Sequence, residues 1–322
     1  MLRPIGSPAT KTGERDVGAF QPVTLGTASR DRLLAAGAMR ATVRAEAGGR
    51  VAALWREEKD GRRIDLLMPM TDAVYDPFVW PKTGSYPLVP WSNLIRDSRF
   101  RFDGAEARVV PNPTTAPHAL HGFAQMRPWQ VTAATDATLD LNFAHVPSEV
   151  APWPWAFEST QHLVLAPDGL SVEIAVKNLS DKPMPAGLGA HPFLMVRHGD
   201  RIRFACREQW QTDASGFATG RREAAAPYDA PQDATARTQH YAGWDGRATI
   251  ERPDGTRIEI AATAPLDQLV FHVPAGGAYA CLEPVSHVVD AFTLAPAGVE
   301  GTGLRRLAPG ERLAAMVKIG LG

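Results

Sequence analysis

The chain has 322 residues, 44% of them hydrophobic, and its 34 basic and 35 acidic residues give a formal net charge of −1. This length and apolar content suffice for a large core, and a near-neutral balance provides no field that would attract nucleic acid or an anionic membrane. We therefore expect neither partner.

The two cysteines, Cys206 and Cys281, cannot form a disulfide framework and belong to no CxxC pair. They predict a reducing, cytoplasmic compartment and no thiolate zinc site.

The amino terminus and the spacing of Gly and Pro set the expected domain organisation. Residues 1–18 lack the apolar core of a signal peptide, and we expect them to form a loose arm. No apolar stretch in the chain approaches the ~20 residues of a membrane helix. The 28 glycines and 27 prolines are spread evenly, which is typical of many short strands rather than one linker. We expect residues 19–322 to form a single domain.

The first two predicted elements lie near the amino terminus. Residues 29–39 are the best candidate for a helix, since helical periodicity is scarce elsewhere in the chain. Residues 41–55 then predict two strands joined by a hairpin turn at Gly48 and Gly49.

The remaining predicted elements are strands. Across residues 170–177, Leu, Val and Ile alternate with Ser, Glu, Ala and Lys, so one face is apolar with period two. Residues 247–260 predict a hairpin whose turn lies at 253–255. Residues 313–319 alternate in the same way and predict a closing strand. Strands at intervals of about a dozen residues, with turn residues between them, predict an all-β sandwich or barrel.

Three histidines and one glutamate occupy unusual settings. His191 lies inside the apolar run GLGAHPFLMV, beside a proline that cannot donate to a sheet. His121 directly precedes a glycine, and His287 follows a Glu-Pro pair. A buried histidine with a satisfied hydrogen bond is the plainer interpretation of each. Glu283 ends an apolar run, so it is either a paired structural ion or a base whose pKa burial has raised.

Several common catalytic and metal-binding motifs are absent from the sequence. No GxGxxG, P-loop or GxSxG motif is present, no histidine pair has the i, i+4 spacing of a helical zinc site, and no acidic loop matches a calcium hand. These absences exclude the commonest nucleotide-dependent enzymes and the serine hydrolases with a nucleophile elbow, and we expect no metal.

Aromatic residues leave two interpretations open. An aromatic face packs well against the C–H face of a pyranose, but it packs equally well in a core. The candidates for either role are Trp91, Trp129, Trp153, Trp155 and Trp244. The alternating basic and aromatic residues of 93–104 likewise fit a solvated strand face.

Five segments, taken in chain order, resemble the aldose 1-epimerase (galactose mutarotase-like) family. They are GSYPLVPWSNLIRDSRFRFDG (84–104), LHGFAQMRPWQV (120–131), LGAHPFLMV (188–196), YAGWDGRATIERPDG (241–255) and CLEPVSHVVDAF (281–292). The resemblance spans most of the chain. It implies a large antiparallel β-sandwich, the galactose mutarotase-like supersandwich, in agreement with the strand pattern.

The family interconverts the α and β anomers of a free aldose, so the resemblance implies an isomerase that takes a small sugar and needs no cofactor. Carried over by motif, His191 is the general acid and Glu283 the general base. His121 would bind substrate hydroxyls or the ring oxygen, and Asn93 would line the pocket. One acid and one base on opposite sides of C1 suffice for the reaction, each contributing about 10²–10⁴-fold. We expect a monomer or a small homo-oligomer.

Two departures from the family pattern bear on sugar preference. The family commonly has Asn-Arg-Ile where this chain has Asn93, Leu94 and Ile95. Arg96 is the expected substitute, because residues two apart on a strand share a face. No aspartate aligns clearly with the family's sugar-binding aspartate. Asp245 is the nearest candidate, and its neighbour Trp244 is a candidate sugar platform.

Two alternative functions remain open at this point. A hexose-6-phosphate 1-epimerase would need converging arginines for the phosphate, and the chain offers Arg96, Arg99 and Arg101. A non-catalytic sugar-binding or regulatory protein on the same fold is the other alternative, because a fold alone does not establish activity.

Overall fold

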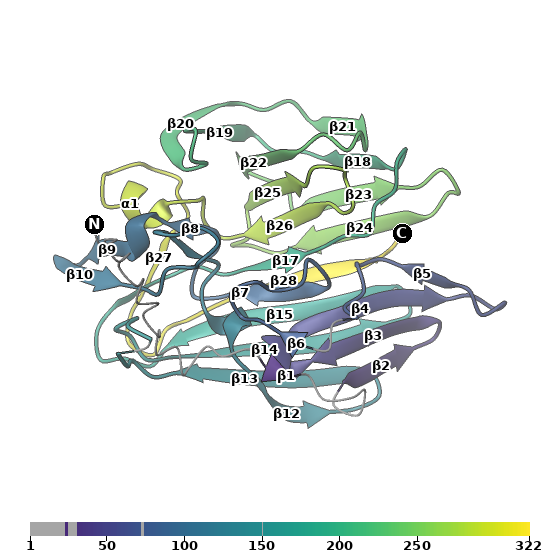
Figure 1. The fold of residues 1–322 in the computed structure, drawn as a ribbon, viewed down its shortest axis with the longest axis horizontal. Helices are drawn as coiled ribbons and strands as arrows, with labels where there is room; N and C mark the ends of the chain where they lie inside the picture. Colours follow the sequence, from purple (N-terminus) through teal and green to yellow (C-terminus); the bar gives the residue numbers. More distant parts are fainter. Residues whose placement is uncertain (1–22, 25–30, 72–73, 150) are drawn as a thin grey trace, which may run out of the picture.

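The computed structural model describes residues 23–24, 31–71, 74–149 and 151–322. Most of the described strands belong to two large antiparallel sheets, as Figure 1 shows. The predicted all-β antiparallel sandwich is therefore confirmed. The expected amino-terminal arm, residues 1–18, lies outside the described residues.

The first sheet has nine strands and contains the longest ones. In spatial order they are β12 (Gln130–Ala134), β13 (Thr138–His145), β14 (Phe157–Ala166), β15 (Gly169–Asn178), β28 (Arg312–Leu321), β24 (Arg257–Ala262), β23 (Arg247–Glu251), β18 (Arg201–Phe204) and β21 (Tyr228–Pro231). The strand predicted over 170–177, the hairpin over 247–260 and the closing strand over 313–319 are β15, β23–β24 and β28.

The second sheet has eleven strands and carries the pocket described below. Its path runs through β2 (Arg32–Ala36), β3 (Met39–Arg44), β4 (Arg50–Glu57), β7 (Ser85–Leu88), β17 (Gly189–Pro192), β26 (Cys281–Val285), β25 (Gln268–Val273), β22 (Arg237–Ala242), β19 (Glu208–Thr212) and β20 (Ala218–Ala224), and β5 (Arg63–Asp65) pairs with β4. The hairpin predicted over 41–55 is β3–β4, which pairs Arg44 with Arg50.

Short elements connect and cover the sheets. Four two-stranded pairs are β1 (Val23–Thr24) with β6 (Val74–Tyr75), β8 (Leu94–Ile95) with β11 (Ala119–Leu120), β9 (Arg99–Phe102) with β10 (Ala105–Arg108), and β16 (Met184–Ala186) with β27 (Arg305–Leu307). The helices are η3 (Ala45–Ala47), η4 (Arg96–Ser98), η5 (Ala124–Met126) and α1 (Ala291–Leu294). Across the part of the chain that the structure describes, no helix has the length and hydropathy to cross a membrane.

The helix predicted over residues 29–39 is wrong. Residues 32–36 and 39–44 form the edge hairpin β2–β3, in which Ala36 pairs with Met39 across a turn at Gly37. Gly37 has a φ of +56°, a left-handed conformation that ends a strand and reverses the chain. Leu34 and Met39 are buried, so the apolar residues here serve a sheet edge rather than one face of a helix.

Period-two alternation decides which residues face the other sheet and which face the pocket. On β17, Ala190 packs in the main core between the sheets, so the neighbouring His191 points to the outer face. On β26, Leu282 belongs to the same core, whereas Cys281 and Val285 belong to a second apolar cluster on the outer face. Glu283, between them, therefore also faces outward.

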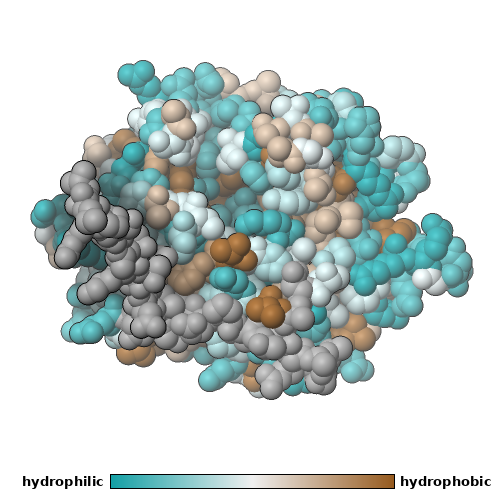
Figure 2. Space-filling model, viewed as in Figure 1, coloured by the Kyte–Doolittle hydropathy of each residue, from teal (hydrophilic) through white to brown (hydrophobic). Residues whose placement is uncertain are grey.

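Figure 2 shows one face of the molecule, and the described residues on it are mixed in hydropathy. Hydrophilic residues dominate its rim, and the strongly hydrophobic residues appear singly. Isolated apolar residues of this kind are normal on a globular protein and indicate no docking surface.

Candidate active site

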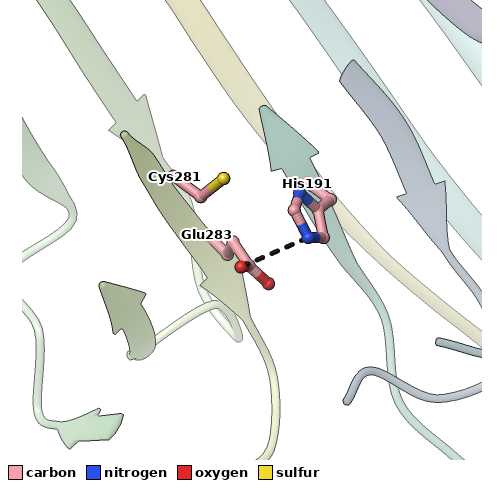
Figure 3. A group of neighbouring side chains, drawn as sticks. All are labelled: His191, Cys281 and Glu283. Carbon is pink, nitrogen blue, oxygen red and sulfur yellow. Dashed lines mark ion pairs between the residues drawn. The ribbon is translucent and has the colours of Figure 1, made fainter. Parts of the chain in front are cut away.

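His191 and Glu283 face each other from neighbouring strands, β17 and β26 (Figure 3). The imidazole Nε2 lies 3.4 Å from the carboxyl Oε1, and the two side chains are 9% and 4% exposed. The other polar atom of each side chain, His191 Nδ1 and Glu283 Oε2, is buried without a hydrogen-bond partner. An unsatisfied buried polar atom costs free energy, so a ligand that bonded these atoms would recover part of that cost.

Aromatic rings hold the His191 imidazole in place. Its ring centroid lies 4.8 Å from that of Tyr86 and 4.6 Å from that of Phe193, and these two rings are 6.2 Å apart. The Tyr86 contact follows from sheet register, since β7 and β17 pair Tyr86 directly with His191. Two neighbouring aromatic rings thus restrict the movement of the imidazole.

Burial changes the protonation of the pair. It raises the pKa of Glu283 from 4.5 to about 8. Burial also holds the pKa of His191 well below its usual 6.5, and the nearby His121, His272, Lys82 and Arg50 lower it further. Both shifts have the same origin, because a low-dielectric setting disfavours whichever form is charged. Near neutral pH the free pair therefore consists of a carboxylic acid and a neutral imidazole.

His121 and Asn93 lock each other in strained conformations. Asn93 N–H donates to His121 Nδ1 at 3.0 Å, and His121 N–H donates to the Asn93 carbonyl oxygen at 2.9 Å. Both residues have positive φ, +63° for His121 and +56° for Asn93, which is uncommon for residues with a side chain. Burial lowers the pKa of His121 to about 3, so the ring is neutral. Because Nδ1 accepts a hydrogen bond, Nε2–H is the donor left for a ligand.

These residues share one open pocket of about 540 Å³. This volume includes the open solvent at the pocket mouth. The lining residues are Trp80, Lys82, Tyr86, Asn93, Leu120, His121, His191, Phe193, Thr238, Val270, His272, Tyr279 and Glu283. Four predicted site residues, His191, Glu283, His121 and Asn93, are therefore brought together.

The structure does not bring Arg96 to this pocket. The chain leaves strand β8 after Ile95, and Asp97 has a φ of +52°, so the alternation that predicted a shared face ends before Arg96. The guanidinium instead pairs with Asp290 at 2.9 Å and packs over the Phe217 ring. Leu94 packs against another apolar cluster, which contains Phe217.

Trp244 and Asp245 also lie away from the pocket, in the turn that precedes β23. The Trp244 indole is 4% exposed within the main core and donates to the Arg247 carbonyl at 3.0 Å. Asp245 is exposed and accepts the Arg247 N–H. The sequence pattern did not decide between a sugar-binding and a core role for four other tryptophans. All four belong to the core: Trp91, Trp129, Trp153 and Trp155. Trp80 is the tryptophan that lines the pocket.

One group of residues has the donor atoms of a metal site. His191, Glu283 and Cys281 offer ligand atoms within 4.8 Å of one another, and Figure 3 shows the Cys281 sulfur beside the pair. Burial raises the pKa of both the Cys281 thiol and the Glu283 carboxyl. A metal needs both groups deprotonated, so a cation would bind here only with release of these protons.

Gly122 fixes the strained turn at His121, and its replacement is expected to be costly. Gly122 has a φ of +68°, and an added Cβ would lie 2.2 Å from the Val89 carbonyl oxygen. We expect Gly122→Ala to lower the free energy of unfolding by about 2 kcal/mol or more, measured by urea denaturation.

Gly255→Ala is the matched control, because Gly255 has a φ of +85° with no atom within 4 Å. It should cost about 1 kcal/mol from the backbone alone. Equal losses in both variants would contradict a packing role for Gly122.

Comparisons with known proteins agree with this architecture. The family model described as aldose 1-epimerase matches residues 33–320. Protein YphB of Escherichia coli (strain K12) is 30% identical over 283 residues, which cover 82% of this chain and 89% of YphB.

Solved structures share the fold. A structure from Escherichia coli K12, named provisionally as an aldose 1-epimerase, is 26% identical with a TM-score of 0.78, covering 91% of this chain and 98% of that one. Slr1438 from Synechocystis sp. PCC 6803 is 22% identical with a TM-score of 0.74, covering 94% of this chain and 98% of its own, and is similar in fold alone. Since the family model spans almost all of the described residues, the chain belongs to the aldose 1-epimerase family.

Proposed function

We propose that this protein interconverts the α and β anomers of a free aldose by general acid–base catalysis at His191 and Glu283. The main support is geometric: an imidazole and a carboxyl lie 3.4 Å apart in one open pocket, each with a second polar atom left unpaired. The family assignment supports the same reaction class.

Anomer exchange requires two proton transfers and one bond rotation. The Glu283 carboxylate takes the proton of the C1 hydroxyl while the His191 imidazolium protonates the ring oxygen O5, and the C1–O5 bond breaks to give the open-chain aldehyde. Rotation about C1–C2 by about half a turn, followed by the reverse transfers, closes the other anomer. No electron or group is gained or lost, so one acid and one base supply the chemistry.

The pair holds the single proton that this cycle needs. In the free site the proton resides on Glu283, since burial raises the pKa of that carboxyl to about 8 and lowers the pKa of His191. In the proposed cycle this arrangement corresponds to the open-chain aldehyde, after Glu283 has gained a proton and His191 has lost one. A ring-closed sugar must shift the proton back to His191, and hydrogen bonds from sugar hydroxyls to the carboxylate favour that shift.

His121 and Asn93 are suited to hold the sugar oxygens. The neutral His121 ring has Nε2–H as its remaining donor. The Asn93 side-chain oxygen accepts from Leu94 N–H at 2.9 Å, which leaves the amide –NH₂ for the pocket. These donors sit on locked backbone, so little ordering entropy is lost when they bind.

Polarimetry with freshly dissolved α-glucose and α-galactose tests the proposal. We expect the protein to increase the first-order rate of mutarotation in proportion to its concentration. Saturable sugar binding without any acceleration, for every aldose tested, would overturn the enzymatic proposal and leave a sugar-binding protein.

A further inference from the structure

The wall of the pocket carries a cation that the proposed reaction does not use. Lys82 lies in the segment between β6 and β7, lines the pocket and is exposed to solvent. Its ammonium nitrogen lies 4.7 Å from the centroid of the Trp80 ring. Trp80 is 4% exposed and makes edge contacts with Tyr86 and His121. The aromatic wall of the site therefore holds the ammonium at the pocket.

Among the described residues, no carboxylate forms an ion pair with this cation. Partial burial lowers the pKa of the Lys82 ammonium and the Arg50 charge lowers it further, whereas the Cys281 charge raises it. Glu283 is the one carboxyl group in the described pocket lining, and burial raises its pKa to about 8. An ammonium without a carboxylate partner, in a pocket whose one described carboxyl is mostly protonated, gives the pocket a positive potential near neutral pH.

A second cation reinforces this potential from behind the pocket. The Arg50 side chain is fully buried, and its guanidinium carbon lies 4.4 Å from the centroid of the Tyr86 ring. Its NH1 donates to the Thr83 carbonyl oxygen at 2.6 Å, whereas Nε and NH2 have no hydrogen-bond partner. Buried charges are normally paired, so an anion in the pocket would offset part of the cost of burying this one.

We propose that the substrate is an aldose with one carboxylate, a hexuronic acid, whose carboxylate pairs with Lys82 while C1 and O5 lie against His191 and Glu283. This inference rests on the proposed function and specifies its substrate class. A monoanion matches a single ammonium, which is a compact point charge. A phosphate dianion is better matched by several converging arginines. Arg99 and Arg101 instead project as exposed residues from β9, and Arg96 pairs with Asp290.

The test is a specificity ratio measured by exchange NMR. For wild type, kcat/KM is measured for glucuronate and galacturonate and for their neutral counterparts, glucose and galactose. We expect the acids to be favoured about tenfold, and we expect added salt to reduce the preference. Lys82→Met keeps the apolar stem on Trp80 but removes the charge, and it should lower the ratio of acid to neutral sugar about tenfold. Lys82→Arg should restore much of it.

Lys177→Met is the matched control, because Lys177 is exposed on β15 in the other sheet, and this variant should leave the ratio unchanged. Acceleration of neutral aldoses with no preference for the acids would overturn this inference and leave the proposed function standing. A preference for hexose 6-phosphates over uronates would also overturn it. If no sugar is accelerated, the proposed function itself fails.

Discussion

Glu283→Gln is expected to lower kcat for anomer exchange by about 10²-fold or more, and His191→Asn by a similar factor. Each variant keeps the approximate size of its side chain and removes one proton-transfer group from the pair. Because the two groups act in the same step, the double variant should be little slower than the slower single variant. The rates are measured by mixing a freshly dissolved pure anomer with each protein and following the optical rotation by polarimetry.

Controls on the opposite sheet separate this effect from a general loss of folding. His162→Asn and Glu158→Gln make the same chemical changes on β14, away from the pocket. They should leave kcat unchanged, and circular dichroism should show the native β-sheet spectrum in all four variants. Rates within about twofold of wild type in both pocket variants would show that another pair of groups performs the chemistry.

The second large effect concerns stability rather than rate. Burial raises the pKa of Glu283 from 4.5 to about 8, so between these values the folded protein binds more protons than the unfolded chain. The contribution of Glu283 to the free energy of unfolding is therefore fully present below pH 4.5 and is lost as pH rises through 8. The slope approaches about 1.4 kcal/mol per pH unit inside this window.

Urea denaturation of wild type and Glu283→Gln at several pH values isolates this contribution. Glutamine does not titrate, and most other ionisable groups cancel in the difference between the two proteins. We expect the variant to gain stability relative to wild type as pH rises from 5 to 8 and the difference to level off above that. Parallel stability curves across this range would mean that the Glu283 carboxyl ionises as readily in the folded protein as in the unfolded chain.

Much of the fold followed from local sequence because period-two patterns are strong where one face of a strand is buried. Residues 170–177 show this alternation, and β15 forms there. The edge hairpin β2–β3 was mistaken for a helix because Leu33, Leu34, Ala35 and Ala36 form a continuous apolar run. Such a run satisfies either period, so it did not reveal that the chain reverses at Gly37 and pairs Ala36 with Met39.

The site was predicted unevenly for a related reason. His191 and Glu283 carry recognisable motifs, whereas Lys82 carries none and reaches the pocket through a loop. Thr238 and His272 lie 34 positions apart and meet only because β22 pairs with β25, where the hydroxyl and Nδ1 are 2.8 Å apart. Neither segment contains a sequence pattern that predicts this pairing.

Two-dimensional proton exchange spectroscopy on an equilibrated aldose tests the central claim most directly, because it observes both anomers interconverting without a net reaction. With wild-type protein, cross-peaks between the α and β anomeric protons should grow in proportion to protein concentration. With the His191→Asn, Glu283→Gln double variant they should fall to the level seen in buffer. Exchange at the buffer rate with wild-type protein for neutral and acidic aldoses alike, or equal exchange with the double variant, would contradict the account.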